Sequence, residues 1–323
     1  MEQLKLFLES CRSPETRSVY AYSLKKFFNF AGELPNDSKI IENKIIQFII
    51  LLKKQGMSYH GISNYFVAIK SYYAVNDVVL NIKRMSRFLP ESKRTKIDRS
   101  YTHEEISGLL SIADERMSVL ILLLASTGIR IGAVPTLRLR NIHNNKLTVY
   151  ENDKEEYFTF ITPECKKVID FYLDMRRRYN EKITDDSYLI REQFDVRCPS
   201  IPKPIAKSGL QFKLYDLCKR CGIDKKNIAI AHGFRKFFTT QLIQSKVNPE
   251  IREMLLGHKI GLASAYYRPT QEDIYAEYEK AIDSLTINEE NRLRKKVEIL
   301  TIEKSRLDRI EEKMLKMEQM YKK

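Results

Sequence analysis

Hydrophobic residues recur every three to four positions along the first ninety residues, the spacing that places them on one face of an α-helix. The pattern predicts three helices, which begin near Ser13, Asp37 and Ser58. Each of these polar residues is a good N-cap, and glycines at positions 32 and 56 end the first two helices. The segment is therefore predicted to be a small helical bundle.

The third of these helices carries a run of aromatic and aliphatic side chains at Tyr65, Phe66, Ile69, Tyr72 and Tyr73. We expect these side chains to pack in a core, with stacking on nucleic-acid bases as the alternative. Lysines are interleaved with the apolar positions and can form a surface that faces phosphate groups; they lie at 25, 26, 53, 54 and 70.

The helical pattern stops at residues 91–100, where large apolar side chains are almost absent and four residues are basic. This composition predicts a basic linker. Directly after it, Thr102 and Glu105 have the spacing of a capping box, so a second domain begins here with a new helix.

The second domain is predicted to be mainly α-helical with one small β-sheet. A buried helix ends at Gly128, and a short helix follows over 134–142. Two alternating runs, 146–150 and 157–162, are separated by a polar turn and predict a β-hairpin. Further helices are expected at 163–179, 208–221, 233–245 and 249–256, with a proline-containing loop over 183–207.

The last part of the chain shows a seven-residue repeat. Leu293, Leu300, Leu307, Met314 and Tyr321 follow one another at this interval in a highly charged segment without Gly or Pro. Such a repeat predicts a long amphipathic helix, which can form a coiled coil with another copy or pack on its own chain. The second apolar position of the repeat is incomplete, so both alternatives stay open.

Composition narrows the class of protein. The chain has 323 residues with 56 Lys and Arg against 42 Asp and Glu, a net charge of +14 and a pI of about 9.4. This excess of positive charge predicts a polyanionic partner, with nucleic acid ahead of an anionic membrane. The longest apolar runs, 45–52 and 119–125, are too short to cross a bilayer, and we see no secretory signal. Five cysteines fit a reducing compartment, so we expect a cytoplasmic protein.

Candidate chemistry is concentrated in residues 231–269. His232 and Arg235 are one helical turn apart and face the same way. Leu256-Gly257-His258 follows, and then the pair Tyr266-Tyr267. Each feature alone has an ordinary structural explanation, such as a surface pair or a helix C-cap. Cys218 and Cys221 are only half of a usual zinc ligand set, so we expect structural thiols and no metal there.

Taken together with the segment Thr127-Gly128-Ile129-Arg130, this set resembles the tyrosine recombinase (phage integrase) family, over about residues 101–280. The resemblance implies six catalytic positions: Arg130, Lys154 in the hairpin turn, His232, Arg235, His258 and the nucleophile Tyr267. The neighbouring Tyr266 is expected to pack in the structure instead. Two departures from the family pattern stand out, because Ala133 replaces a common carboxylate and the hairpin lacks the usual glycines. Lys146 is therefore the alternative to Lys154.

The resemblance also implies an organisation and a reaction. Residues 1–90 correspond to a helical DNA core-binding domain, 91–100 to the linker, 101–286 to the catalytic domain and 287–323 to the heptad tail. Double-stranded DNA is the implied partner, cut and rejoined through a 3′-phosphotyrosine by four protomers on two DNA sites, in association with the nucleoid. No cofactor or metal is implied. Two alternatives are a catalytically silent DNA-binding protein of the same fold and a type IB topoisomerase-like enzyme.

Residue chemistry agrees with this reaction. A tyrosine phenol, with a pKa near 10, needs a base or a strong positive field before it attacks a phosphodiester. Arginines can hold two phosphate oxygens at once, which lysine does not reproduce. Lysine carries a proton at pH 7 and can give it to the leaving oxygen in a desolvated cationic site. The reaction expected is integration and excision of a mobile element, or resolution of chromosome dimers.

Overall fold

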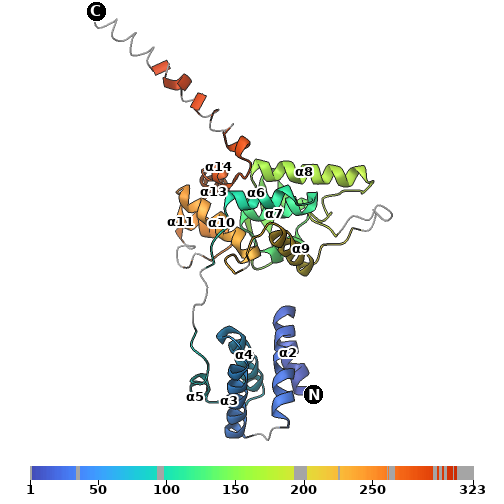
Figure 1. The fold of residues 1–323 in the computed structure, drawn as a ribbon, viewed down its shortest axis with the longest axis vertical. Coiled ribbons are helices and arrows are strands. Elements are labelled where there is room, and N and C mark those ends of the chain that lie inside the picture. Colours follow the sequence, from blue (N-terminus) through green and yellow to red (C-terminus); the bar gives the residue numbers. More distant parts are fainter. Residues whose placement is uncertain are drawn as a thin grey trace, which may run out of the picture. The chain divides into compact units, whose positions relative to one another are not determined.

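The computed structural model describes most of the chain. The described residues are 2–33, 37–92, 98–192, 202–224, 226–259, 261, 266–293, 297, 300–301, 304–307 and 309–310. The chain forms two compact units, Met1–Thr95 and Lys96–Lys323 (Figure 1). No helix in the described ranges combines the length and the apolar character needed to cross a membrane.

The first unit is helical. Its helices are α1 (Glu2–Ser10), α2 (Pro14–Ala31), α3 (Ser38–Lys54), α4 (Tyr59–Val75) and α5 (Ile82–Ser86). The predicted N-caps form, because the side chains of Ser13, Asp37 and Ser58 each accept hydrogen bonds from backbone N–H groups in the first turn. Helix α2 packs against α3 and α4, so the bundle is closed by contacts among these three helices.

The aromatic residues of α4 belong to the core of this bundle, as predicted. Tyr65, Phe66 and Tyr73 are buried, and burial raises the pKa of Tyr73 to about 12. Phe48 from α3 meets Tyr65 edge to face with ring centroids 5.7 Å apart. These rings are therefore used for packing and are not available to stack on bases.

The second unit is built around one largely buried helix, α7 (Glu115–Thr127). Its helices are α6 (His103–Ser111), α7 (Glu115–Thr127), α8 (Pro163–Arg178), α9 (Lys207–Arg220), α10 (Ile230–Gln244), α11 (Pro249–Leu255), α13 (Gln271–Glu279) and α14 (Ile282–Leu285). The capping box of Thr102 and Glu105 forms at the start of α6. Every residue of α7 from Val119 to Thr127 is buried, and the helix packs against α6, α8 and α10.

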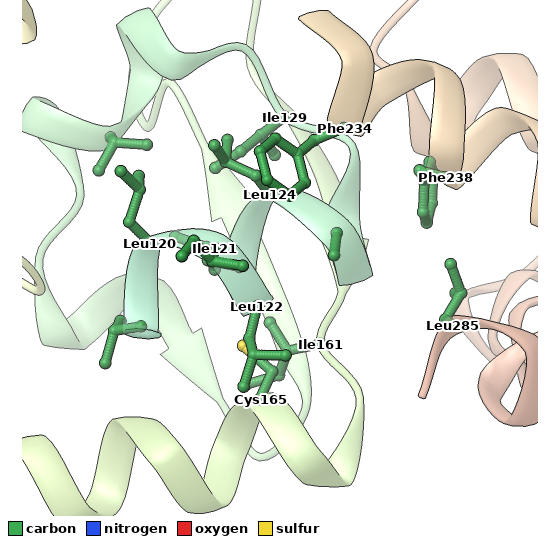
Figure 2. Packing of buried hydrophobic residues seen from close by; sticks show 14 of the residues in the cluster. Leu120, Ile121, Leu122, Leu124, Ile129, Ile161, Cys165, Phe234, Phe238 and Leu285 are labelled. Carbon is green, nitrogen blue, oxygen red and sulfur yellow. The ribbon is translucent and has the colours of Figure 1, made fainter. Parts of the chain in front are cut away.

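Side chains from several helices meet around α7. Leu122 of α7 lies near Ile161 and Cys165, while Leu124 and Ile129 lie near Phe234 of α10 (Figure 2). All six side chains are at most 3% exposed. Burial in this apolar core raises the pKa of the Cys165 thiol to about 12, which keeps the thiol protonated and inert.

The sheet has three short antiparallel strands in the order β1 (Ile142–His143), β2 (Lys146–Val149) and β3 (Tyr157–Phe160). Strands β2 and β3 form the predicted hairpin, with Lys146 opposite Phe160 and Val149 opposite Tyr157. Strand β1 was not predicted, because two residues are too few to show an alternating pattern. The turn that links β2 to β3 carries Lys154.

The single short helix predicted over 134–142 is wrong. The chain instead forms two 3-10 helices, Ile131–Thr136 and Leu139–Asn141. Pro135 has no N–H group to donate to a helical hydrogen bond, and Leu137 is extended. Asn141 then caps this bend by accepting a hydrogen bond of 2.7 Å from the backbone N–H of Arg138.

A buried ion cluster fixes part of the predicted loop 183–207 against α8. Glu181 accepts hydrogen bonds from Arg176 at 2.6 and 3.0 Å and from Arg191 at 2.7 Å. All three side chains are nearly inaccessible to solvent. The two guanidinium groups hold the pKa of the Glu181 carboxyl below its usual value although burial alone raises it. The carboxylate therefore offsets part of the positive charge of the two buried guanidinium groups.

The heptad segment lies largely outside the described residues. Of its repeat positions, Leu293, Leu300 and Leu307 are described, and all three are exposed. Self-association and packing on the same chain both stay predictions for this segment.

Candidate active site

Two neighbouring cavities hold five of the six predicted site residues. The larger one, about 610 Å³, is lined by Arg130, Lys154 and His258, together with Lys146 and Tyr157. The second, about 440 Å³, is lined by His232, Arg235 and again His258. His258 contributes to both walls, so the cavities adjoin at this ring. The structure thus brings together residues from α10, from the hairpin turn and from the ends of α7 and α11.

Arg235 is the most firmly held of these residues. It lies on α10 and is 6% exposed. Its Nη1 donates to the carbonyl oxygen of Gly128 at 2.8 Å, and its Nη2 donates to that of Leu256 at 2.6 Å. Burial and the nearby charge of Arg130 lower its pKa from the usual arginine value. An arginine nevertheless stays protonated at neutral pH, so the site keeps a fixed positive charge.

Gly128 supplies one of these carbonyl groups because of its backbone conformation. It ends α7 in the left-handed region at φ 62° and its N–H bonds the carbonyl of Leu124. A Cβ at this position would lie 2.5 Å from the ring of Phe238, so a side chain does not fit. Glycine is needed here for two reasons, the positive φ and the close approach of α10.

Arg130 follows two residues after this glycine, and its side chain lines the larger cavity. It is exposed, and it makes no hydrogen bond or ion pair with any described residue. Ala133, where a carboxylate is common in the family, is fully buried in the apolar core. The loop that carries Arg130 therefore gives this side chain no acidic partner, and its charge is available to a ligand.

His258 is held between the carboxylate of Glu253 and the guanidinium group of Arg235. Its Nδ1 lies 2.6 Å from a carboxylate oxygen of Glu253, and its Nε2 lies 2.8 Å from Nη2 of Arg235. Glu253 belongs to α11, and no motif in the sequence singles it out. The pairing depends on the turn after α11, which brings residue 258 back over residue 253 through a hydrogen bond between their backbones.

His232 lies in the first turn of α10, one turn before Arg235. Partial burial and the positive charges of Lys236 and Arg235 lower its pKa below the usual histidine value, partly opposed by Asp98. Lys236 is itself paired with Asp98, with 2.5 Å between Nζ and a carboxylate oxygen. His232 is therefore neutral at pH 7 and able to accept a proton.

The two candidate lysines differ in their surroundings. Nζ of Lys146 donates to the side chain of Gln271 at 2.9 Å and lies over the ring of Phe158. Lys154 is exposed on the hairpin turn and forms no hydrogen bond or ion pair among the described residues. Both line the larger cavity, but Lys154 has the ammonium group that is free to reach a ligand.

Tyr267 is the one predicted site residue that lines neither cavity. It is half-buried and packs against the core of the second unit. The expectation that Tyr266 packs is wrong, because its side chain is 91% exposed. The two neighbouring side chains point in different directions: Tyr266 faces solvent, and Tyr267 faces the core. Tyr275 and Tyr278 do pack as predicted, with the Tyr278 hydroxyl bonded to the carbonyl of Ser126.

Two further tyrosines at the site were not anticipated. Tyr157 of β3 is packed against Gly257, and the Arg235 guanidinium beside it partly offsets the rise in its pKa that burial causes. Tyr150 directly follows β2, and burial likewise raises its pKa although Arg130 and Arg235 oppose this. Their ring centroids are 6.4 Å apart, and Tyr157 lines the larger cavity.

The described residues contain no group of three histidines, cysteines or carboxylates placed to hold a metal ion. Cys218 contacts the hydroxyl of Tyr101 at 3.4 Å, and Cys221 donates to the carbonyl of Gly108 at 3.4 Å. The site instead presents two arginines, one free lysine and a neutral histidine. This set can neutralise a phosphate group and exchange protons with oxygen atoms on either side of it.

Comparison with known proteins places this geometry in context. The family model described as Phage integrase family matches residues 99–272. Tyrosine recombinase XerA of Pyrococcus horikoshii is 23% identical over 286 residues, which cover 87% of this chain and 93% of the relative. Tyrosine recombinase XerC of Lactobacillus leichmannii is 21% identical over 304 residues, which cover 86% of this chain and 96% of the relative.

Solved structures share the fold. The Tn1549 transposon integrase in complex with circular intermediate DNA has a TM-score of 0.62 at 17% identity, covering 86% of this chain and 99% of that one. A lambda integrase dimer bound to a core site has a TM-score of 0.60 at 13% identity, covering 83% and 96%. The fold of this chain is thus that of DNA-bound integrases.

Proposed function

This chain belongs to the phage integrase family, the tyrosine recombinases, and from this premise we propose that it is a site-specific DNA recombinase. It cuts and rejoins DNA strands through a 3′-phosphotyrosine intermediate. The observation that carries the proposal is the convergence of Arg130, Lys154, His232, Arg235 and His258, from segments far apart in the sequence, on two adjoining cavities.

The two arginines are proposed to bind the scissile phosphate. Arg235 is held in place by backbone carbonyls, whereas Arg130 extends freely into the larger cavity. A phosphate between them gains charge-assisted hydrogen bonds. These bonds strengthen as negative charge builds on the non-bridging oxygen atoms in the transition state. This accounts for a preformed anion site in which one arginine is rigid and the other adapts.

Proton transfers are assigned to the remaining residues. Oη of Tyr267 attacks phosphorus, the bond between phosphorus and the 5′-oxygen breaks, and the phenol proton passes to neutral His232. Lys154 gives a proton to the leaving 5′-oxygen, which departs as a hydroxyl group. A 5′-hydroxyl of the partner strand then reverses these steps and restores the phosphodiester, so the bond energy is kept and no ATP is consumed.

Tyr267 must reach the phosphate for this step, although it packs beside the core and outside both cavity walls in this structure. We therefore assign its approach to the DNA-bound state. The spacing of nine residues from His258 to Tyr267 supports Tyr267 over Tyr266 as the nucleophile.

Double-stranded DNA is the proposed substrate, with residues 1–90 as its core-binding domain, 91–100 as the linker and 101–286 as the catalytic domain. A lambda integrase tetramer bound to a Holliday junction shares the fold, with a TM-score of 0.58. By this likeness four protomers exchange strands between two sites on the nucleoid. Integration and excision of a mobile element is the proposed task, with resolution of chromosome dimers as the alternative.

Covalent trapping tests the proposal directly. The binding site is first selected from a pool of randomised duplexes, and a nick is then placed near the cleavage position so that the cut strand is lost. Wild-type protein is expected to form an adduct that survives detergent. Tyr267→Phe is expected to form none, and Tyr266→Phe, which alters an exposed neighbour, is the matched control and keeps the adduct.

The other outcomes separate the alternatives. An adduct that persists in Tyr267→Phe assigns the nucleophile elsewhere. Tight, specific binding without any adduct in the wild type indicates a catalytically silent DNA-binding protein. Relaxation of supercoiled circles without joined duplexes of new parentage indicates a topoisomerase-like enzyme.

A further inference from the structure

A chain of hydrogen bonds links an acidic residue outside the predicted set to Arg235. Glu253 Oε2 lies 2.6 Å from Nδ1 of His258, and Nε2 of the same ring lies 2.8 Å from Nη2 of Arg235. The imidazole thus connects a carboxylate with a guanidinium through its two nitrogen atoms. All three side chains line the same cavity.

These distances fix the proton positions on His258. A guanidinium group only donates hydrogen bonds, so Nε2 must accept from Arg235 and carry no proton. The remaining proton of the neutral ring is then on Nδ1, where it is donated to Glu253. A doubly protonated ring would point an N–H group at an N–H group of Arg235, which the short distance does not allow.

The ring in turn determines how Arg235 is held. Among the described residues, the other hydrogen bonds of the guanidinium go to the backbone carbonyls of Gly128 and Leu256. Three of the five N–H groups of Arg235 are thereby used: one on Nη1 and both on Nη2. His258 supplies a side-chain bond to Nη2, and Tyr157 is a second side chain beside the guanidinium. A substitution that alters the His258 ring therefore changes one of the bonds that hold Arg235.

Glu253 is the acidic residue that bonds the His258 ring, which in turn contacts Arg235. The other carboxylate in the cavity, Asp98, is 2.5 Å from Nζ of Lys236. Ala133, near Arg130, is buried in the core and brings no charge. The second oxygen atom of the Glu253 carboxylate lies 3.7 Å from Nε of Arg252.

We propose that Glu253 is a positioning residue of the recombinase: it fixes the Nδ1–H tautomer of His258, so that Nε2 accepts from Arg235 and keeps the guanidinium oriented toward the scissile phosphate. The inference rests on the proposed function for its catalytic consequence. Its structural part, the tautomer, stands on the two distances alone. A residue that acts through the tautomer of a histidine can affect a rate strongly without touching the substrate.

Nitrogen NMR of the full chain labelled at histidine tests the structural part without any activity. The His258 signals are identified by their loss in His258→Gln, and the spectra are taken at a pH where this ring is neutral. The wild type is expected to carry its proton on Nδ1. Glu253→Ala, which has no acceptor, is expected to shift the population toward Nε2–H, and Glu253→Gln, whose amide oxygen still accepts, is expected to keep Nδ1–H.

Single-turnover cleavage of the nicked duplex tests the catalytic part. Glu253→Ala is expected to cleave about ten- to a hundred-fold more slowly at saturating protein, a cost typical of residues that orient a functional histidine. Glu253→Gln is expected to recover most of the rate. Glu250→Ala removes the same charge from the same helix without a side-chain bond to the site and is the matched control, expected to match the wild type.

The proposal holds only if both quantities change together. A wild-type ring protonated on Nε2, an unchanged tautomer in Glu253→Ala, or an unchanged cleavage rate in that variant each overturns it. Should Glu253→Ala not fold, a Glu253→Gln variant that loses the Nδ1–H tautomer contradicts the proposal equally. Absence of an adduct in the wild type refutes the proposed function instead, so the two failures are distinguished.

Discussion

His232 shows how neighbouring charges adjust a single side chain to its task. Burial lowers its pKa first, and the positive charges of Lys236 and Arg235 lower it further. Both effects oppose the charged imidazolium, so the ring stays neutral as the pH falls through the usual histidine range near 6.5 and becomes charged only below it. A neutral ring is the form that can take the proton of a tyrosine.

Removal of Lys236 should therefore raise the titration midpoint of His232. In Lys236→Met the opposing charge is lost while Asp98, which favours the imidazolium, remains. NMR titration of the DNA-free protein measures the midpoint, expected below 6.5 in the wild type and higher in the variant. Lys219→Met, an exposed lysine on α9, is expected to leave the midpoint unchanged. An equal shift in both variants would contradict this explanation.

Gly257 is a residue whose replacement should affect both stability and cleavage. Its φ is 67°, and a Cβ there would lie 2.5 Å from the ring of Tyr157. Gly257→Ala is expected to lower the free energy of unfolding by more than about 1–2 kcal/mol, the cost of the left-handed conformation alone, and to slow cleavage by moving Tyr157. Urea unfolding and covalent trapping measure the two effects.

The control is Gly222→Ala, which has the same backbone strain at φ 69° but meets nothing within 4 Å. It is expected to show the backbone cost without any loss of cleavage. If the two variants unfold and cleave alike, the contact with Tyr157 has no role.

Which single residues could be predicted depended on spacing along the chain. His232 and Arg235 share a helix, and their position in one cavity follows from the helical repeat. Glu253 and Tyr157 reach the site through a turn and a strand, so only the folded chain shows that they contact His258 or Arg235. Tyr266 was assigned the wrong environment because spacing selects a nucleophile but does not determine which neighbour is exposed.

Among the elements, α8 and the segment that follows it depend on one buried carboxylate. Glu181 compensates two buried guanidinium groups, from Arg176 and Arg191. Glu181→Gln removes the negative charge but keeps the size of the side chain, so the buried positive charge is no longer balanced. We expect the free energy of unfolding to fall by about 3–5 kcal/mol, the usual effect of breaking a buried ion pair.

The comparison for this change is Asp174→Asn, which breaks an exposed ion pair with Arg177 on the same helix. Exposed pairs contribute less than about 1 kcal/mol. The loss in free energy of unfolding, measured with urea, should therefore be clearly larger for Glu181→Gln than for Asp174→Asn. Similar losses would show that the buried ion pairs stabilise the unit no more than an exposed pair does.

Elements were predictable where the chain carries both a repeat and a cap. Helices α2, α3 and α4 begin at the polar caps that the sequence shows. Helix α10 begins at Ile230, three residues earlier than predicted. Its N-cap residue is Ala229, which has no capping side chain, so the sequence carries no signal for the start of this helix. The bend over 131–141 was missed because the apolar spacing suits a helix while Pro135 prevents one.

At the scale of the whole molecule, the heptad segment predicts a role in assembly. Its described repeat residues Leu293, Leu300 and Leu307 line neither cavity, so deletion of residues 288–323 is expected to impair pairing of two DNA sites more than binding to one. Gel-shift titration on a single site and on paired sites measures the two quantities for the full and shortened chains. Equal loss of both would show that the segment supports the catalytic unit itself.

The position of Arg235 ties the chemistry to the core. Its carbonyl acceptors belong to Gly128, which ends the largely buried α7, and to Leu256, which ends α11. These oxygen atoms cannot move without displacing side chains packed around α7. Heat inactivation should accordingly coincide with cooperative melting of the catalytic unit, with no gradual decline before it. Selection for a warmer or colder habitat would then act on the interior of the protein, since the temperature range of the reaction is set by residues that never meet the DNA.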